Sequence, residues 1–475
     1  MQNILLAIII LLAVSHGKCQ VTELKSENAR LKAEIEQLKL QLEEQRKIAQ
    51  EAQALALNNS EFAKRQKYLA SASALALKAT GNFLDPQLKG LLAIQAYKFN
   101  KKHEGPVFNT EVFAGIYSAL SYENGGFDDI TTQSLQGHNQ QVSAITKGSG
   151  FSIYSGDSNG KILHWKIEKG VVSADTIMRK QKGEHHIKDM LLSPDERYLL
   201  SVGSFRDSKR KRDYLEVIDL HNNNQVTKIT GFLGVIKDIE VLESQSRYFV
   251  LSEKGMNVQE VDIQTGTISD FIKPEVKIND LAISADGRYL AGAGANGNVF
   301  VWDLNNGNSQ VPHPANRSVE NTALLFSPDG RYLVVGELSG IIHLFNTETN
   351  QRVRTITDFQ QKVTGIKFSP DGQYLAVSSL ASQIRVWNMK NLSARPYVMN
   401  LYGWATSMSF SSDSRFLFGG GADAGEIRVW PMNIDVMANK LCGLITRGFT
   451  KEEWVFYVDE ISEDYPYDGE TCNLK

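Results

Sequence analysis

Cysteine is scarce in this sequence of 475 residues, which contains only Cys19, Cys442 and Cys472. Three cysteines are too few for a disulfide framework, so a hydrophobic core must hold the fold together, and the 42% hydrophobic content supplies one. Cys442 and Cys472 would pair in an oxidising compartment, whereas two free, partly buried thiols are the alternative. The residues themselves leave both possibilities open.

An excess of one charge is also missing, because 51 Lys and Arg residues face 54 Asp and Glu residues, for a formal net charge of −3. This balance removes the bulk electrostatic attraction on which a dedicated nucleic-acid binder relies, although local basic patches remain. We therefore expect no nucleic-acid partner.

The sequence lacks a recognisable catalytic or metal-binding pattern. No phosphate-binding loop of the form Gly-x-x-x-x-Gly-Lys-Ser/Thr occurs, since Ile162 follows Gly160-Lys161. His185 and His186 are adjacent, so in an extended segment they point in opposite directions, and no third ligand is indicated nearby. We predict a protein that is not an enzyme and has no catalytic residues, cofactor or metal.

Residues 1–17 have the character of a targeting segment, with an unbroken apolar run of eleven residues from Ile4 to Val14. Such a run fits a signal peptide better than a bilayer-spanning helix, which needs roughly 20 residues. The prediction is an exported protein, periplasmic or associated with the cell envelope. Because no Lys or Arg precedes the run, an uncleaved membrane anchor at residues 4–14 is the alternative.

Residues 21–52 carry apolar side chains on a heptad period, which predicts a parallel coiled coil. Glu27 and Glu34 would face Lys32 and Lys39 of a second chain, and Asn28 would bond its twin across the interface. A single amphipathic helix packed on its own domain is the alternative. The predicted dimer interface consists of Leu24, Asn28, Leu31, Ile35, Leu38 and Leu42.

Residues 53–126 are predicted to form a helical collar. An Ala-rich helix should run to about Ala79, and Asp85 followed by Pro86 should begin a second helix. Asn109 or Thr110 would cap a third helix, which Gly125-Gly126 would end.

The strongest internal signal is self-similarity with a period of about forty residues. Variants of one turn lead into one strand at Ser193-Pro-Asp-Glu-Arg-Tyr-Leu199, Ser284-Ala-Asp-Gly-Arg-Tyr-Leu290, Ser327-Pro-Asp-Gly-Arg-Tyr-Leu333 and Ser369-Pro-Asp-Gly-Gln-Tyr-Leu375. Degenerate copies lie at residues 243–249 and 411–417. The Asp residues of these turns are expected to form the turns rather than to act in catalysis.

Over residues 128–432 this pattern resembles the WD-repeat family. Trp302-Asp303 is a literal Trp-Asp pair, and Leu135-Gln-Gly-His138 is similar to the Gly-His segment of the family. The resemblance implies a structural hydrogen-bonded tetrad, which one unit comes close to having. The other units depart from the family here and are expected to rely on packing alone. The members of the tetrad would be His138, Ser155, Asn159 and Trp165, with Asn159 standing where the family has Asp.

Counting from Val142 to Trp430 gives seven repeat units. The predicted fold is therefore mainly β: a seven-bladed WD-type β-propeller preceded by the coiled coil and collar and followed by a small helical C-terminal tail. Pairing of an extra strand at residues 130–135 with the strand near Trp430 would close the ring and bring collar and tail together.

The tail, residues 434–475, begins with a helical stretch through Leu441-Cys442, and Thr450-Lys-Glu-Glu453 is a capping box that opens another helix. The tail resembles those that follow WD propellers in bacterial multidomain proteins, some of which carry a signalling NTPase domain. The resemblance implies a bacterial assembly role.

Binding residues are expected on one face of the propeller, because repeat arrays present loop-built faces to partners. The second unit is lengthened by a basic loop at residues 204–213, and segments that enter the first strands of units should open on the same face. The proposed residues are Arg206, Lys209, Arg210, Lys211 and Arg212 of the loop, with His185, Arg317, Tyr402 and Trp404 from the entering segments.

The sequence thus favours a non-enzymatic scaffold of the bacterial cell envelope, dimerised by its coiled coil and binding a protein partner through the propeller. A membrane-tethered signalling or sensor module is one alternative. The other is a propeller hydrolase acting on a glycan or peptide, which would require acidic or His side chains that converge on the central channel.

Overall fold

The structure is a computed structural model that describes residues 2–81, 85–105, 109–120, 134–150, 152–168, 171–178, 186–207, 210–232, 234–252, 256–311, 319–393, 395–401, 403–421 and 425–458, with Tyr467 and Cys472. By its internal contacts the chain divides into two units, Met1–Ala70 and Ser71–Lys475.

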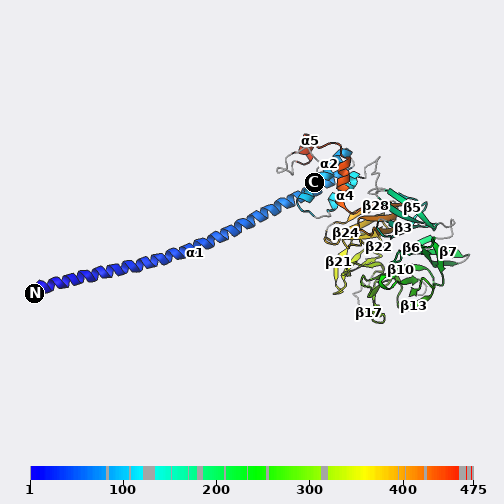
Figure 1. Ribbon diagram of the computed structural model, residues 1–475, viewed down its shortest axis with the longest axis horizontal. Coiled ribbons are helices and arrows are strands. Elements are labelled where there is room, and N and C mark those ends of the chain that lie inside the picture. Colours follow the sequence, from blue (N-terminus) through cyan, green and yellow to red (C-terminus); the bar gives the residue numbers. More distant parts are fainter. Residues whose placement is uncertain are drawn as a thin grey trace. The chain divides into compact units, whose positions relative to one another are not determined.

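The first unit is helical throughout its described length. It is part of one continuous helix, α1 (Gln2–Ala79), which ends at the predicted residue (Figure 1). Ile35 and Leu38 of the predicted seam are 51% and 58% exposed in the single chain, and Leu31 and Leu42 are exposed to the same degree. Within the described residues, no helix is long and apolar enough to cross a membrane.

The second unit is built around a ring of antiparallel sheets, of which seven, each with four strands, occur in the described part of the chain. Blade 1 contains β2 (Val142–Lys147), β3 (Ser152–Asp157), β4 (Ile162–Glu168) and β5 (Val171–Met178). Blade 2 contains β6 (His186–Leu192), β7 (Tyr198–Asp207), β8 (Arg210–Asp219) and β9 (Gln225–Ile229). Blade 3 contains β10 (Ile236–Leu242), β11 (Arg247–Ser252), β12 (Asn257–Val261) and β13 (Ile268–Ile272), with a short 3₁₀ turn, Glu243–Gln245, between its first two strands.

The remaining blades repeat this order. Blade 4 contains β14 (Ile278–Ile283), β15 (Tyr289–Gly294), β16 (Val299–Asp303) and β17 (Ser309–Val311). Blade 5 contains β18 (Asn321–Phe326), β19 (Tyr332–Glu337), β20 (Ile342–Asn346) and β21 (Arg352–Ile356). Blade 6 contains β22 (Val363–Phe368), β23 (Tyr374–Ser379), β24 (Gln383–Asn388) and β25 (Tyr397–Asn400). Blade 7 contains β26 (Ala405–Phe410), β27 (Phe416–Gly421), β28 (Glu426–Pro431) and β1 (Ser134–Gln136).

The ring closes as the sequence predicts. β1 pairs with β28 in antiparallel register, with Leu135 opposite Ile427, so a strand from before the first blade completes the last one. Leu135 is buried in a cluster that also contains Val142 of blade 1 and Phe418 of blade 7. The predicted seven-bladed propeller is therefore confirmed, and the part of the predicted closing strand before residue 134 lies outside the described residues.

Neighbouring blades approach closely because small residues face the next first strand. A Cβ atom at Gly156 of β3 would lie 2.6 Å from Cγ2 of Ile187 in blade 2. A Cβ atom at Gly336 of β19 would lie 2.5 Å from Cγ1 of Val363 in blade 6. Each of these blade joints would have to open if a larger residue replaced the glycine.

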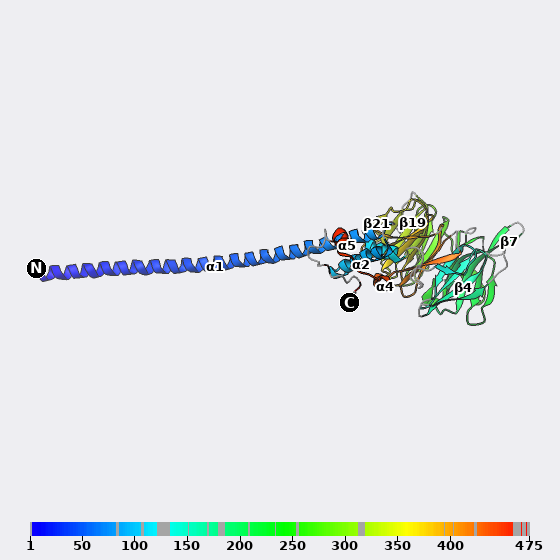
Figure 2. The same cartoon turned by 90° about the horizontal axis from the view of Figure 1, so that it is seen from above.

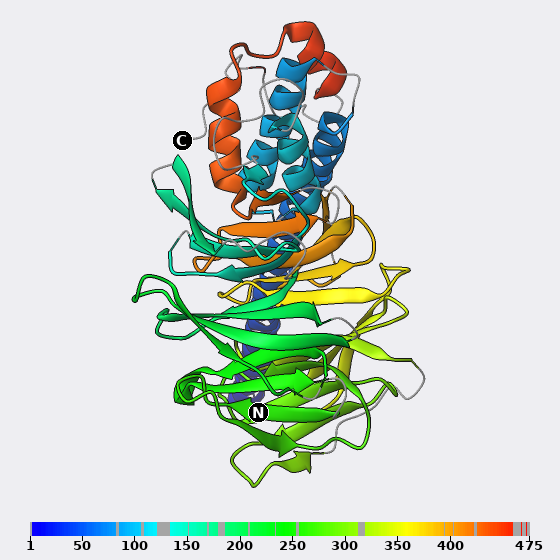
Figure 3. The same ribbon diagram turned by 90° about the vertical axis from the view of Figure 1, so that its right-hand side faces the viewer.

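Helices of the second unit pack beside the ring (Figure 3). α2 (Pro86–Lys102), α3 (Thr110–Leu120) and α4 (Ile434–Leu444) contact one another, and α5 (Lys451–Tyr457) follows in the tail. The side chain of Asp85 accepts the N–H of Leu88 at 3.0 Å and caps α2, as predicted. Asn109, one of the two predicted caps, accepts the N–H of Val112 at 3.1 Å and caps α3. The predicted stop at Gly125-Gly126 lies outside the described residues.

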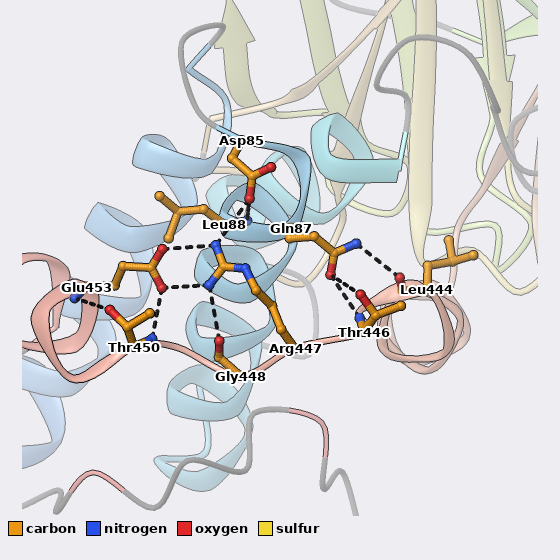
Figure 4. Close-up of polar contacts among 9 residues, drawn as sticks. All are labelled: Asp85, Gln87, Leu88, Leu444, Thr446, Arg447, Gly448, Thr450 and Glu453. Carbon is orange, nitrogen blue, oxygen red and sulfur yellow. Dashed lines mark hydrogen bonds and ion pairs between the residues drawn. The ribbon is translucent and has the colours of Figure 1, made fainter.

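The predicted closeness of collar and tail is also confirmed, by polar contacts centred on Arg447 (Figure 4). The Arg447 guanidinium donates to both carboxylate oxygens of Glu453, at 2.7 and 2.9 Å, and to Asp85 at 3.1 Å. Gln87 of α2 accepts the N–H of Thr446 at 2.8 Å. The predicted capping box is present, since Thr450 and Glu453 exchange both of its hydrogen bonds.

Candidate partner-binding face of the propeller

A buried polar tetrad organises blade 1. The Trp165 Nε1–H donates to Ser155 Oγ at 2.7 Å, Ser155 Oγ lies 2.7 Å from His138 Nε2, and His138 Nδ1 lies 3.0 Å from Asp157 Oδ2. Because the indole N–H can only donate, Ser155 directs its own hydrogen to His138, whose Nδ1–H then faces Asp157. All four side chains are nearly fully buried.

This geometry corrects one sequence-based assignment. Asp157, not Asn159, supplies the acidic member of the tetrad, because the carboxylate comes from the last residue of β3 and Asn159 contributes its backbone N–H to that same carboxylate at 2.9 Å. Burial opposes ionisation of Asp157, yet the hydrogen bonds from His138 and from the N–H groups of Lys161 and Asn159 hold its pKa below the usual value. The acidic member of the tetrad therefore lies two residues earlier in the sequence than predicted.

The expectation that the other units rely on packing alone was also wrong. In five blades a Ser hydroxyl donates to the Asp two residues later at 2.5–2.7 Å and accepts a backbone N–H from the following strand. This arrangement confirms that the Asp residues of the repeated turns form the turns. The serines are Ser193, Ser284, Ser327, Ser369 and Ser411.

Polar contacts also join one blade to the next. The Thr322 hydroxyl of blade 5 donates to the carbonyl of Val363 in blade 6 at 2.7 Å, and the Thr406 hydroxyl of blade 7 donates to that of Val142 in blade 1 at 2.6 Å. Ser143 makes the equivalent bond to Ile187. Each of these side chains belongs to the second residue of its inner strand. The three bonds therefore join neighbouring blades at the same level of the ring.

At other joints carboxyl groups replace the hydroxyls. Asp238 Oδ2 of blade 3 accepts the N–H of Leu281 in blade 4 at 2.8 Å, and Asp280 Oδ2 of blade 4 accepts the N–H of Leu324 in blade 5 at 2.7 Å. Burial raises the pKa values of both Asp238 and Asp280, and the charge of Asp238 raises that of Asp280 further. Sequence reasoning missed these carboxyl groups because nothing in the repeat distinguishes them from ordinary strand residues.

The joint carboxyl groups line the central channel. The inner strands contact one another around the ring, and Lys367 of blade 6 acts electrostatically on Asp189 of blade 2 and on Glu240 of blade 3 across it. Burial and the charge of Asp238 raise the pKa of Asp189 to about 7. The same two causes raise the pKa values of Glu240 and Asp280 well above the usual range. Folding therefore favours the neutral form of these carboxyl groups.

Acidic side chains do converge on the channel, which is what the hydrolase alternative requires. However, Asp238 and Asp280 are engaged by backbone N–H groups of the next blade, so their structural role is already accounted for. Among the described residues no group of three or more His, Cys, Asp or Glu side chains could hold a metal ion. His186 lies at the start of β6, while His185 lies outside the described residues.

We call one face of the ring the hairpin face. It carries the loops that lead into the inner strands and the turns between the second and third strands of the blades. On it, Trp404 before β26 is 61% exposed, Leu338 after β19 is 46% exposed and Leu380 after β23 is 41% exposed. These three side chains belong to the consecutive blades 7, 5 and 6. Leu338 and Leu380 were not predicted from the sequence, since single apolar residues in turns carry no periodic signal.

The basic segment of blade 2 differs from its prediction as a loop. β7 and β8 each continue for ten residues, and β7 extends outward from the ring (Figure 2). The hairpin pairs Ser204 with Asp213 and Asp207 with Arg210. At its base the buried Asp213 carboxylate accepts the N–H of Ile236 in blade 3 at 2.8 Å and pairs with Lys188. The hairpin is therefore anchored to the ring rather than free at its root.

The other predicted binding residues are only partly described. Arg206, Arg210, Lys211 and Arg212 lie in the strands of the hairpin, but their side chains are outside the described residues, as are Lys209, His185, Arg317 and Tyr402. The exposed Trp404 is the predicted residue whose side chain the structure places on the hairpin face. The hairpin belongs to blade 2 and Trp404 to blade 7, so these two described parts of the prediction lie on different blades.

Comparisons with known proteins agree with this architecture. Residues 242–394 match the family model described as Eukaryotic translation initiation factor eIF2A. The chain is 25% identical over 251 residues to WD repeat-containing protein 1 of Bos taurus, covering 50% of this chain and 38% of that protein. It is 32% identical over 93 residues to the Protein LST8 homolog of Drosophila melanogaster, covering 18% of this chain and 30% of the relative. The comparisons support a WD-repeat propeller.

A further WD-repeat relative is WD repeat-containing protein dyf-2 of Caenorhabditis elegans, 32% identical over 102 residues, or 21% of this chain and 7% of the relative. The chain thus spans well under two thirds of the length of these relatives, all of which are eukaryotic. The matches support the WD-repeat resemblance of the repeats and do not extend to the predicted bacterial type.

Replacement of Asp157 by Ala is expected to lower the free energy of unfolding of the WD-repeat propeller by about 3 kcal/mol, because His138 and two backbone N–H groups lose their acceptor. Asn159→Ala is the matched control and should cost no more than about 0.5 kcal/mol, since only the backbone N–H of Asn159 takes part. Urea unfolding of both variants measures the difference. Equal losses would contradict the assignment of Asp157 to the tetrad.

The channel carboxyl groups make stability depend on pH. Because the pKa of Asp189 is raised to about 7 on folding, its favourable contribution is complete at low pH and is lost as the pH rises through 7. The free energy of unfolding of the wild type should therefore fall between about pH 4 and pH 7, by at most about 4 kcal/mol for this group. Asp189→Asn should reduce that slope.

Asp262→Asn is the control, because the pKa of the exposed Asp262 carboxyl is lowered by the N–H groups of Thr265 and Gln264 and its titration lies below this window. Urea unfolding at several pH values provides the measurement. Parallel curves for wild type and Asp189→Asn would show that Asp189 does not titrate there.

Proposed function

We propose that the chain is a non-enzymatic scaffold of the bacterial cell envelope, dimerised through α1, whose propeller binds a protein partner on the hairpin face. The observation that carries the proposal is the exposure of Trp404, Leu338 and Leu380 on three consecutive blades of that face. Large exposed apolar side chains on a loop-built face are typical of protein-binding surfaces, and Trp is enriched among residues that dominate binding energy.

The relatives support the general part of this role. WD-repeat propellers generally act as protein-interaction scaffolds, and proteins named for WD repeats are among the relatives of this chain. Two of the channel carboxyl groups, Asp238 and Asp280, accept N–H groups of the next blade, which supports a structural role for them rather than a catalytic one. The hydrolase alternative is therefore less well supported than the scaffold.

The chemistry of the partner follows from charge. The hairpin sequence from residue 206 to 212 contributes five basic residues within seven, which favours an acidic surface on the partner. The anchored base of the hairpin, with Asp213 bonded to Ile236, supports its use as a fixed arm rather than a solvated loop. A polyanionic glycan or a lipid headgroup would be attracted by the same charges, and the binding experiment below separates them from a protein.

Dimerisation is supported by the unpartnered seam of α1. Leu31, Ile35, Leu38 and Leu42 are each more than half exposed, although they recur at heptad positions suited to burial against a second helix. Asn28 is exposed within this stripe, where it would pair with its twin in a parallel dimer and set the register. A second copy of the chain is therefore the proposed partner of the stripe.

The proposed location rests on the apolar run at residues 4–14, which supports export, with an uncleaved anchor as the alternative. Either form would place the dimer at the envelope, and the anchored form would suit a signalling or sensor module. The mass of the natively expressed protein, together with its membrane or soluble fraction, distinguishes the two.

Trp404→Ala should weaken capture of the protein partner from an envelope extract by at least about tenfold, because a central aromatic contact contributes 2 kcal/mol or more. Val353→Ala is the control, since Val353 is 55% exposed on the outer strand β21. A specific protein must be retained by the wild type and the control but lost with Trp404→Ala, and treatment of the extract with protease must abolish it. Identical capture by all three proteins would refute the proposed face.

The dimer is tested by a pair of equally drastic changes on one helix. Leu38→Asp places a charge in the seam and should convert the dimer to a monomer, whereas Leu40→Asp, on the opposite side of the heptad, should leave the dimer intact. Both leucines are well exposed in the single chain, at 58% and 66%. Sedimentation equilibrium gives the mass. A monomeric wild type, or dissociation by both changes, would rule out the proposed interface.

A further inference from the structure

The helices beside the ring bring two cysteines together from distant positions in the sequence. Cys442 lies on α4, whereas Cys472 lies in the tail beyond α5. Both are half-buried free thiols, and their side chains are in hydrogen-bonding contact with each other. The pairing that the sequence left open is therefore sterically possible without any large movement of the chain.

Other contacts hold the tail in place, so the two thiols do not depend on each other for their closeness. The Tyr467 hydroxyl donates to the carbonyl of Phe449 at 2.5 Å, and its ring lies 5.8 Å from that of Trp454. The Arg447 contacts with Glu453 and Asp85 fix the segment between α4 and α5 to the start of α2. A tail secured in this way presents Cys472 to Cys442 at a high effective concentration.

The two thiols act on each other. The hydrogen bond between Cys442 and Cys472 couples their protonation, burial acts to raise both pKa values, and the positive charge of Lys98 on α2 acts to lower both. Either thiol can therefore attack an external disulfide, and the other is placed as the second thiol of the pair.

We propose that Cys442 and Cys472 are an oxidisable dithiol whose disulfide fastens the C-terminal tail to α4. With a small-molecule disulfide such as glutathione disulfide as oxidant, the thiolate of one cysteine, written here as Cys472, attacks one sulfur and releases one glutathione thiolate. Cys442 then loses its proton and attacks Cys472 in the mixed disulfide, forming the Cys442–Cys472 bond and releasing the second glutathione. Two cysteine thiols are oxidised and one glutathione disulfide is reduced to two thiols.

The consequence is a covalent loop that spans residues 443–471 and includes α5. Such a crosslink would limit the freedom of the unfolded chain and raise the stability of the helices beside the ring. The proposal does not rest on the proposed scaffold function, because it concerns the helices and tail rather than the hairpin face. It does connect to location, since the disulfide would form in an oxidising compartment and remain a dithiol in a reducing one.

The experiment uses the full chain with Cys19→Ser, which removes the third thiol. The reduced protein is incubated with glutathione disulfide, and intact mass and peptide mapping follow without reductant. We expect the loss of two hydrogen atoms, a peptide linked through Cys442 and Cys472, and a higher thermal midpoint that dithiothreitol reverses.

Cys442→Ser and Cys472→Ser, each in the same background, are the controls. Each should have the thermal midpoint of the reduced parent, which shows that it folds, and should gain one glutathione without forming the linked peptide. Separate glutathione adducts on both cysteines of the parent, with no crosslink, would overturn the proposal. So would a crosslink that lowers the thermal midpoint, because the thiols would then not be placed for bonding in the folded protein.

Discussion

Closure of the ring is the constraint on which the rest of the second unit depends. An antiparallel sheet with an open edge exposes unpaired backbone groups, and pairing of β1 with β28 covers the third strand of the last blade and leaves only the three residues of β1 as its outer edge. The bond from Thr406 to the carbonyl of Val142 secures the inner side of that junction. Because β1 precedes the first blade in the sequence, its pairing also brings the segments on both sides of the propeller together.

The helices beside the ring follow from this closure. The chain leaves β28 and enters α4 after two residues, so the tail meets α2 and α3 where the chain had approached the ring. Phe113 of α3 contacts Tyr397 of blade 6, with ring centroids 4.5 Å apart, and the Thr110 hydroxyl donates to the carbonyl of Arg395. These contacts use an outer strand of the propeller, so Trp404, Leu338 and Leu380 stay exposed on the hairpin face.

Polar groups inside the ring serve its assembly in two chemically different ways. Hydroxyl groups such as Thr322 bond the next blade without any dependence on pH, whereas Asp238 and Asp280 do so with groups that titrate. A carboxyl group accepts an N–H well in either protonation state, but several carboxylates around one narrow channel repel each other. Burial favours the neutral form, and this makes the inner surface of blades 2 to 4 the part of the ring most sensitive to protonation.

What the sequence by itself determined was the repeating architecture. The turns at Ser284 and Ser327, the caps of α2 and α3 and the capping box at Thr450 are encoded by a few adjacent residues, so local chemistry was enough to predict them. The tertiary structure decided everything that depends on distant segments meeting. Asp157 rather than Asn159 contacts His138, Asp189 and Asp238 lie around one channel, and Cys472 contacts Cys442. The sequence could not predict these contacts because they are set by how whole blades and helices pack.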